Sequence, residues 1–115
     1  MRQSLRTSLF LVLVFLCGCG GESYPPTAEG VYNAKCSRCH ELDGSSTTAT
    51  ELADAPIDLR KAFFQKNVSG PEMKRIMEFG AGRMQGVPDL TPADLDSIVL
   101  HIRFLGRQYA EQNHN

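Results

Sequence analysis

The sequence predicts an all-α domain, because of the spacing of its apolar residues and its helix end signals. From Thr27 onward no stretch alternates apolar and polar residues with a period of two, so no half-buried strand is expected. Apolar residues recur at helical spacing instead, between start and stop signals typical of helices. A chain of 115 residues has room for one small domain. We therefore expect one domain of four or five short helices.

The first two helices are predicted from local signals. Thr27 can cap a helix that runs through "AEGVYNAKC" and ends near Cys36. The next stretch, residues 41–58, is rich in Ser, Thr, Asp and Ala and is mostly loop. Asp58 can then cap a short helix over "LRKAFFQK", with Asn67 as a left-handed stop.

A third helix has a clearer start signal. Ser69 and Glu72 have the spacing of a capping box, and Pro71 lies in the first turn, where its missing N–H costs little. Met73 and Met77 share one helical face, which predicts that they are core residues.

The last helix is the most convincing in the chain. Thr91 and Asp94 repeat the start signal. A continuous apolar stripe follows at helical spacing, made of Leu95, Ile98, Val99, Ile102 and Leu105.

The first segment, "MRQSLRTSLFLVLVFLCGCGG", has the order of an export signal. Arg2 and Arg6 precede an apolar run over residues 9–16, and small residues follow. Eight apolar residues are too few to span a bilayer, which takes roughly 20. We expect residues 1–18 to be a cleaved signal peptide.

The end of this segment, residues 16–19, resembles a bacterial lipobox. In that motif the last cysteine receives a lipid and becomes the mature N-terminus, which implies lipidation of Cys19. The alternative is an ordinary signal peptide that is cut nearby and leaves a spare cysteine. We expect residues 19–26, which include a Pro pair, to be a short tether.

The charge of the remaining chain excludes some partners. We expect the domain to span residues 27–107, with a tail at 108–115. Removal of Arg2 and Arg6 from the 12 basic residues leaves 10 against 13 acidic residues. No basic stripe is present, so nucleic acid is not expected as a partner.

The stretch "NAKCSRCHEL" contains the sequence Cys-x-x-Cys-His, at Cys36, Cys39 and His40. This is the attachment sequence of c-type haem. Each thiol adds across one vinyl group of the porphyrin, and the histidine beside the second thioether is aimed at the iron. The export signal agrees with this interpretation, since bacteria attach haem after export. We expect one covalent haem c, which also supplies a core for the short helices.

Two other chemistries use a pair of cysteines at this spacing. A thioredoxin-like redox pair starts a helix after a strand, in a βαβ context that this chain lacks. A structural zinc site needs four ligands, and no second Cys-x-x-Cys is present.

The mature chain also resembles the class I cytochrome c family. Tyr32, four residues before Cys36, stands where that family has an aromatic residue in its first helix. Residues 79–105 resemble its C-terminal half, in which a glycine and three residues precede the distal methionine, here Met84. The resemblance implies a cytochrome c fold, with helices around one haem and the N- and C-terminal helices crossing.

The resemblance further implies the roles of individual residues. His40 and Met84 would be the axial ligands of the iron. The "APIDL" stretch resembles the segment whose proline carbonyl accepts a hydrogen bond from the haem histidine, so Pro56 would hold His40 Nδ1–H. Two departures are Gln85, where many relatives have Pro, and His101, where the last helix usually has an aromatic residue. His101 is either an alternative sixth ligand or a packed polar residue with a local partner.

The expected function follows from the sixth ligand. With His and Met both bound, the iron has no open position and is suited to electron transfer only, which favours a single-electron carrier rather than an enzyme. The export signal and the lipobox-like residues imply that this carrier is periplasmic and tethered by a lipid. Its partners would be a membrane oxidase, reductase or dehydrogenase, and the domain would be a free monomer or a subunit of one complex. One alternative is an enzyme or gas sensor with an open distal site. Another is a haem-free thiol or metal-binding lipoprotein.

Overall fold

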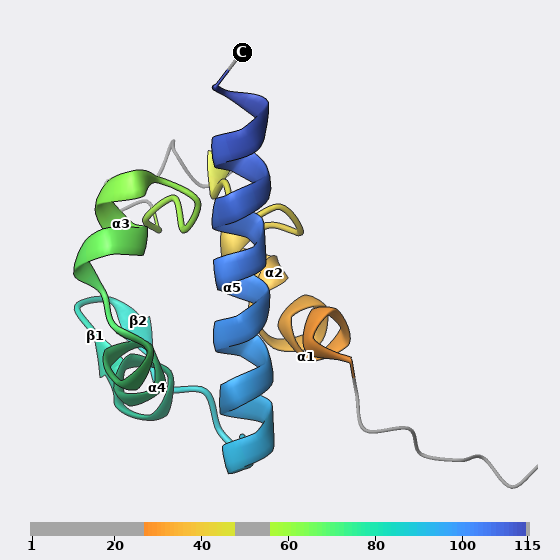
Figure 1. The fold of residues 1–115 in the computed structure, drawn as a ribbon. Coiled ribbons are helices and arrows are strands. Elements are labelled where there is room, and N and C mark those ends of the chain that lie inside the picture. The colour runs from red at the N-terminus through yellow and green to blue at the C-terminus, as the bar shows by residue number, and fades with distance from the viewer. Residues whose placement is uncertain (1–26, 48–55, 115) are drawn as a thin grey trace, which may run out of the picture.

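The computed structural model describes residues 27–47 and 56–114, and it confirms the all-α fold class. The expectations for the signal peptide, the tether and Cys19 lie outside these residues. The helices are α1 (Ala28–Lys35), α2 (Ser37–His40), α3 (Ala62–Asn67), α4 (Gly70–Phe79) and α5 (Pro92–Gln112). Helix α5 runs the length of the fold, with α1 on one side and α3 and α4 on the other (Figure 1).

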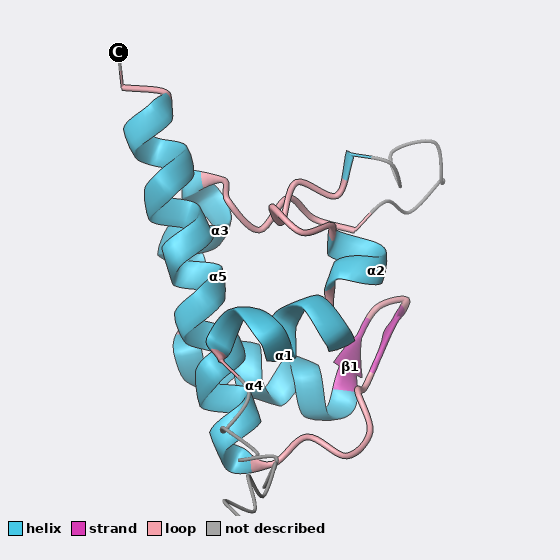
Figure 2. Cartoon of the chain, turned by 90° about the vertical axis from the view of Figure 1, so that its right-hand side faces the viewer, coloured by secondary structure: helices cyan, strands magenta, loops and turns pink. Residues whose placement is uncertain are grey.

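Helices α1 and α5 cross, as the resemblance to class I cytochromes c implied. Both views show their axes at a wide angle (Figures 1 and 2). Tyr32 of α1 is fully buried there, and its ring centroid lies 4.8 Å from that of His101 on α5. This contact places the start of the cysteine turn, just after Tyr32, against the central helix.

Three predicted helix starts are confirmed by their cap hydrogen bonds. The Thr27 side chain accepts from the backbone N–H of Gly30, at 3.0 Å. Ser69 accepts from Glu72 N–H at 3.3 Å, at the start of α4. At α5 both bonds of a capping box are present: Thr91 Oγ1 accepts from N–H of residue 94, and the carboxylate there accepts from Thr91 N–H.

The predicted start of α3 at Asp58 is wrong. The helix begins at Ala62, with Lys61 as its N-cap. Asp58 forms a tighter local turn instead, because its carboxylate accepts from both the backbone N–H and the guanidinium of Arg60.

The predicted left-handed stop at Asn67 is also wrong. Asn67 is the last helical residue, and the chain continues in an extended conformation at Val68. The carbonyls at this helix end are bound by Arg103 of α5, which donates to Gln65 O at 2.7 Å and to Val68 O at 2.6 Å. A residue far along the sequence therefore terminates α3.

Two short strands and a longer last helix depart from the expected elements. β1 (Gly80–Ala81) and β2 (Met84–Gln85) form an antiparallel pair after α4. Helix α5 has 21 residues and includes 108–112, which the sequence assigned to a tail.

The core gathers side chains from all of the longer helices. Met73 and Met77 are buried as predicted, and so is most of the apolar stripe of α5. The buried apolar residues are Val31, Tyr32, Cys36, Leu59, Phe64, Met73, Met77, Leu95, Ile98, Ile102 and Leu105. Within the described ranges, no helix is both long enough and apolar enough to cross a membrane.

Candidate haem site

The cysteine turn joins α1 to α2. Cys36 lies at the junction, where its N–H donates to Tyr32 O at 2.7 Å, and its carbonyl accepts from His40 N–H at 3.0 Å. One helical turn therefore presents Cys36, Cys39 and His40 in succession. Both thiols are free; that of Cys36 is buried and that of Cys39 is exposed.

The protonation of Cys36 is unlike that of a redox-active thiol. Burial, and secondarily the neighbouring Cys39, raises the pKa of the Cys36 thiol to about 11. The thiol is therefore protonated at neutral pH, whereas redox-active dithiols have a cysteine of lowered pKa. Within residues 27–47 and 56–114, no group of three His, Cys, Asp or Glu side chains that could hold a metal ion is found.

The imidazole of His40 is half-buried and belongs to a chain of hydrogen bonds. Its Nδ1 lies 3.2 Å from Ser46 Oγ, and the Ser46 hydroxyl donates to Ile57 O at 3.0 Å. A hydroxyl has one hydrogen, and that hydrogen goes to Ile57, so Ser46 accepts from a protonated Nδ1. Nε2 is then the unprotonated nitrogen that a metal requires.

Burial favours the same neutral form of His40. Desolvation lowers its pKa, and the carbonyl of Ile57 opposes this shift. At neutral pH the imidazole is thus uncharged, with its proton on Nδ1 and an electron pair on Nε2 that can bind a metal.

The acceptor expected for His40 Nδ1–H is the carbonyl of Pro56. The imidazole of His40 reaches the following peptide, at Ile57, by way of Ser46. The direct bond to the Pro56 carbonyl therefore stays a prediction. Sequence reasoning missed Ser46 because it is one of several similar residues in a Ser/Thr-rich loop.

Met84 lies on β2, half-buried against the edge of the core. Met84 pairs with Ala81 of β1, and the backbone turns back at Gly82, which has a φ of 56°. Gly80 has a φ of 80°, and a Cβ there would lie 2.4 Å from Met84 O. Glycine is therefore required at Gly80 for the backbone of Met84 to approach so closely.

α2 and this hairpin lie on one side of α5 in Figure 2 and on different sides of it in Figure 1. In Figure 2 both lie to the right of α5, and in Figure 1 the hairpin lies beside α4 while α2 lies behind α5, toward α1. His40 lies on α2 and Met84 lies on the hairpin, so the two residues come from different segments beside the central helix.

The other candidate ligands, Met73, Met77 and His101, are buried among side chains of the protein. Met73 and Met77 are buried in the core. His101 is buried at the crossing of α1 and α5, between the rings of Tyr32 and Phe104. This position fits a packed polar residue, but the expected local partner is not found, since His101 Nε2 has no hydrogen-bond partner among residues 27–47 and 56–114.

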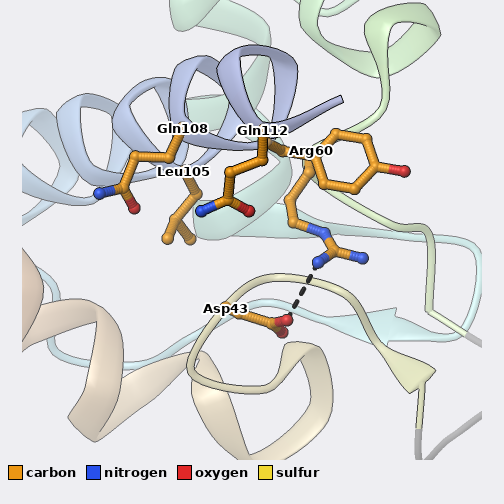
Figure 3. Close-up of a pocket in the computed structure, with 6 residues that line it drawn as sticks. Asp43, Arg60, Leu105, Gln108 and Gln112 are labelled. Atoms are coloured by element: carbon orange, nitrogen blue, oxygen red, sulfur yellow. Dashed lines mark hydrogen bonds and ion pairs between the residues drawn. The ribbon is translucent and has the colours of Figure 1, made fainter. Parts of the chain in front are cut away.

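An ion-pair cluster fastens the loop that follows His40. Arg60 donates to Asp43 at 3.0 Å (Figure 3). It also donates to Asp58 at 2.9 Å, and its guanidinium lies over the ring of Tyr109. Although burial opposes ionisation, the hydrogen bonds and charge of Arg60 hold the pKa of Asp58 below its ordinary value. The cluster ties the segment of Ser46 to the segment of Ile57.

Comparison with protein families decides which group these residues serve. The family model described as cytochrome c oxidase, cbb3-type, subunit III matches residues 25–102. The chain belongs to this family. A cytochrome c domain of this family carries a covalently bound c-type haem and transfers electrons through it. Neither the curated proteins nor the solved structures include a significant match.

The donors of this cytochrome c domain fit such a haem. Two free thiols stand on one helical turn, as attachment through two vinyl groups requires. The following imidazole has its Nδ1 engaged and its Nε2 available. A soft thioether lies on the hairpin, and it has no charge to neutralise.

Proposed function

We propose that this cytochrome c domain is a single-electron carrier whose iron is bound by His40 and Met84. The observation that carries the proposal is the hydrogen-bond chain at His40, which leaves Nε2 as the metal-binding nitrogen. Met84 is the supporting observation, since it is a half-buried methionine next to the core, on a hairpin whose close backbone approach requires Gly80. Cys36 and Cys39 would form the two thioether links.

This ligand pair supports electron transfer rather than catalysis. The haem supplies one-electron chemistry when it is bound. The imidazole is held by Ser46, and the Met84 backbone is held between Gly80 and the core, so neither donor has to move when the charge of the site changes. With His40 and Met84 both bound to the iron, water and small gases would be kept from it.

We further propose a periplasmic location and a lipid anchor. Cytochrome c domains are generally exported, which agrees with the signal-like residues 1–18 and with Cys19 in its lipobox-like context. The family description names an oxidase subunit, so a membrane oxidase is the favoured partner among the membrane oxidoreductases expected from the sequence. Tethering through residues 19–26 would raise the effective concentration of the domain near such a partner.

The test is an optical spectrum of the haem-loaded protein and of two methionine variants. Met84→Leu removes the thioether of the proposed ligand. Met73→Leu is the control, because it removes a thioether from a buried core position. We expect the wild type and Met73→Leu to be low-spin with a thioether-to-iron charge-transfer band. Met84→Leu should lose that band.

Other results would contradict the proposal. A band that survives in Met84→Leu would exclude Met84 as the ligand. A high-spin wild type that binds carbon monoxide would mean an open distal site, and the enzyme or gas-sensor alternative would then replace the carrier.

A further inference from the structure

Ser46 is held in a conformation that serine rarely adopts. Its φ is 59°, in the left-handed region, and its side chain is only 1% exposed. Such a conformation is unfavourable for a non-glycine residue, and it persists where the surroundings require it. Two more left-handed residues, Glu41 and Gly44, bend the same loop.

The bends bring Ser46 back beside the histidine. Its N–H donates to His40 O at 3.2 Å, so backbone and side chain of Ser46 both contact the same residue. The conformation of Ser46 therefore places a buried hydroxyl beside Nδ1 of the His40 imidazole.

The far end of the hydroxyl chain is fixed as well. Ile57 lies in a segment that is bound to the Ser46 loop by Leu59 N–H, which donates to Gly44 O at 3.0 Å. Arg60 adds its ion pair with Asp43, three residues after the histidine. Ser46 thus bridges two segments whose relative position is set by other bonds.

We propose that Ser46 is a positioning residue that tunes the reduction potential of the haem iron, by relaying the Nδ1–H of His40 to the Ile57 carbonyl. This inference rests on the proposed role of His40 as an axial ligand. An acceptor at Nδ1–H increases the basicity of the coordinating nitrogen, which favours ferric iron. The Ser46 hydroxyl is a better acceptor than an isolated hydroxyl would be, because it donates its own hydrogen to the Ile57 carbonyl.

The direction of the effect follows. Without the hydroxyl, Nδ1–H loses its acceptor, Nε2 becomes a weaker donor, and the ferrous state gains relative to the ferric state. Removal of Ser46 Oγ should therefore raise the reduction potential.

The test uses Ser46→Ala and Ser46→Gly, with Ser45→Ala as the matched control. Ser45 is the adjacent buried serine, at 7% exposure, and its hydroxyl bonds to Thr47 Oγ1 rather than to His40. Ser46→Gly also removes the left-handed strain, so agreement between the two Ser46 variants assigns the effect to the hydroxyl. The measurements are a redox titration of each haem-loaded protein and the exchange rate of the Nδ1 proton in the ferrous state by NMR.

Both Ser46 variants should shift the ferric–ferrous equilibrium constant toward ferrous iron by up to about tenfold, which is about 59 mV for one electron. Their Nδ1 proton should exchange faster, and Ser45→Ala should match the wild type in both measurements. If the Ser46 variants keep the wild-type potential while the spectrum stays low-spin, the inference is overturned and the carrier proposal stands. If the wild type itself is high-spin, the carrier proposal has failed before any serine is changed.

Discussion

His101 occupies a position at which a histidine is costly to bury. It is 7% exposed between Tyr32 and Phe104, and its Nε2 has no hydrogen-bond partner among residues 27–47 and 56–114. Burial lowers the pKa of the imidazole, and the charge of Glu29 opposes this only in part. The folded protein therefore favours the neutral ring, whereas the unfolded chain takes up a proton near pH 6.5.

The sign of the resulting pH dependence is fixed by this difference. A lowered pKa in the folded state means that the stability is complete above about pH 6.5 and is lost as the pH falls toward the folded value. We expect His101→Phe to raise the free energy of unfolding by about 1 kcal/mol, because an unsatisfied buried nitrogen is removed. The variant should also lose less stability between about pH 7.5 and about pH 5.5 than the wild type.

Guanidinium unfolding of the haem-loaded protein at the two pH values measures both effects. The control is His114→Phe, a substitution at an exposed histidine beyond the last helix. Equal losses of stability in wild type and His101→Phe would contradict the assignment.

At the scale of elements, the hairpin that carries Met84 depends on glycines in two different ways. A Cβ at Gly80 would lie 2.4 Å from Met84 O and 2.9 Å from Gly86 N, both of them backbone atoms. A Cβ at Gly82 would meet nothing within 4 Å. Both glycines have a left-handed φ, so they share the conformational cost of substitution and differ in the clash.

We expect Gly82→Ala to cost about 1 kcal/mol, which is the cost of a left-handed alanine. Gly80→Ala should cost clearly more, because the two strands must move apart and the Met84 backbone must shift. Unfolding free energies and the thioether-to-iron band provide the comparison: the band should weaken in Gly80→Ala and persist in Gly82→Ala. Identical spectra and stabilities for the pair would show that the close approach of Gly80 has no role in placing Met84.

At the scale of the whole molecule, the core is small and large apolar side chains remain outside it. Several large apolar side chains are exposed, with Phe63 at 73% and Phe79 at 77%. The others of this kind are Leu42, Ile57, Leu100 and Phe104. A domain of this size rarely stabilises itself by its own core alone, and a covalent haem adds a large apolar body.

The stability of the fold should therefore depend on the haem. We expect the same chain, made without haem attachment and kept reduced, to have less helix and a broad thermal transition at lower temperature. Circular dichroism melts of the haem-free and haem-loaded proteins, with identical sequences, measure the difference. Met84→Leu is a useful third sample, since it removes the proposed axial ligand but keeps both cysteines of the haem attachment sequence. A haem-free chain that melts as sharply and as high as the loaded protein would refute this dependence.

Much of the fold could be predicted from sequence because the relevant forces are local. The Ser69 and Thr91 caps lie within one turn of the N–H groups they bind, and the α5 stripe records which face is buried. The haem could be predicted for the same reason, since both thiols and His40 lie on one turn. Family membership then agreed with the motif.

What the sequence by itself determined about this protein was its helical class, the N-caps at Thr27, Ser69 and Thr91, and the presence of a covalent haem. Only the tertiary structure decided that Arg103 ends α3 and that Arg60 draws Asp58 away from a helix cap. It also decided that Ser46, among several similar residues, reaches His40. Each of these contacts depends on the path of the backbone between distant or sharply turned segments, and no local periodicity or spacing encodes that path.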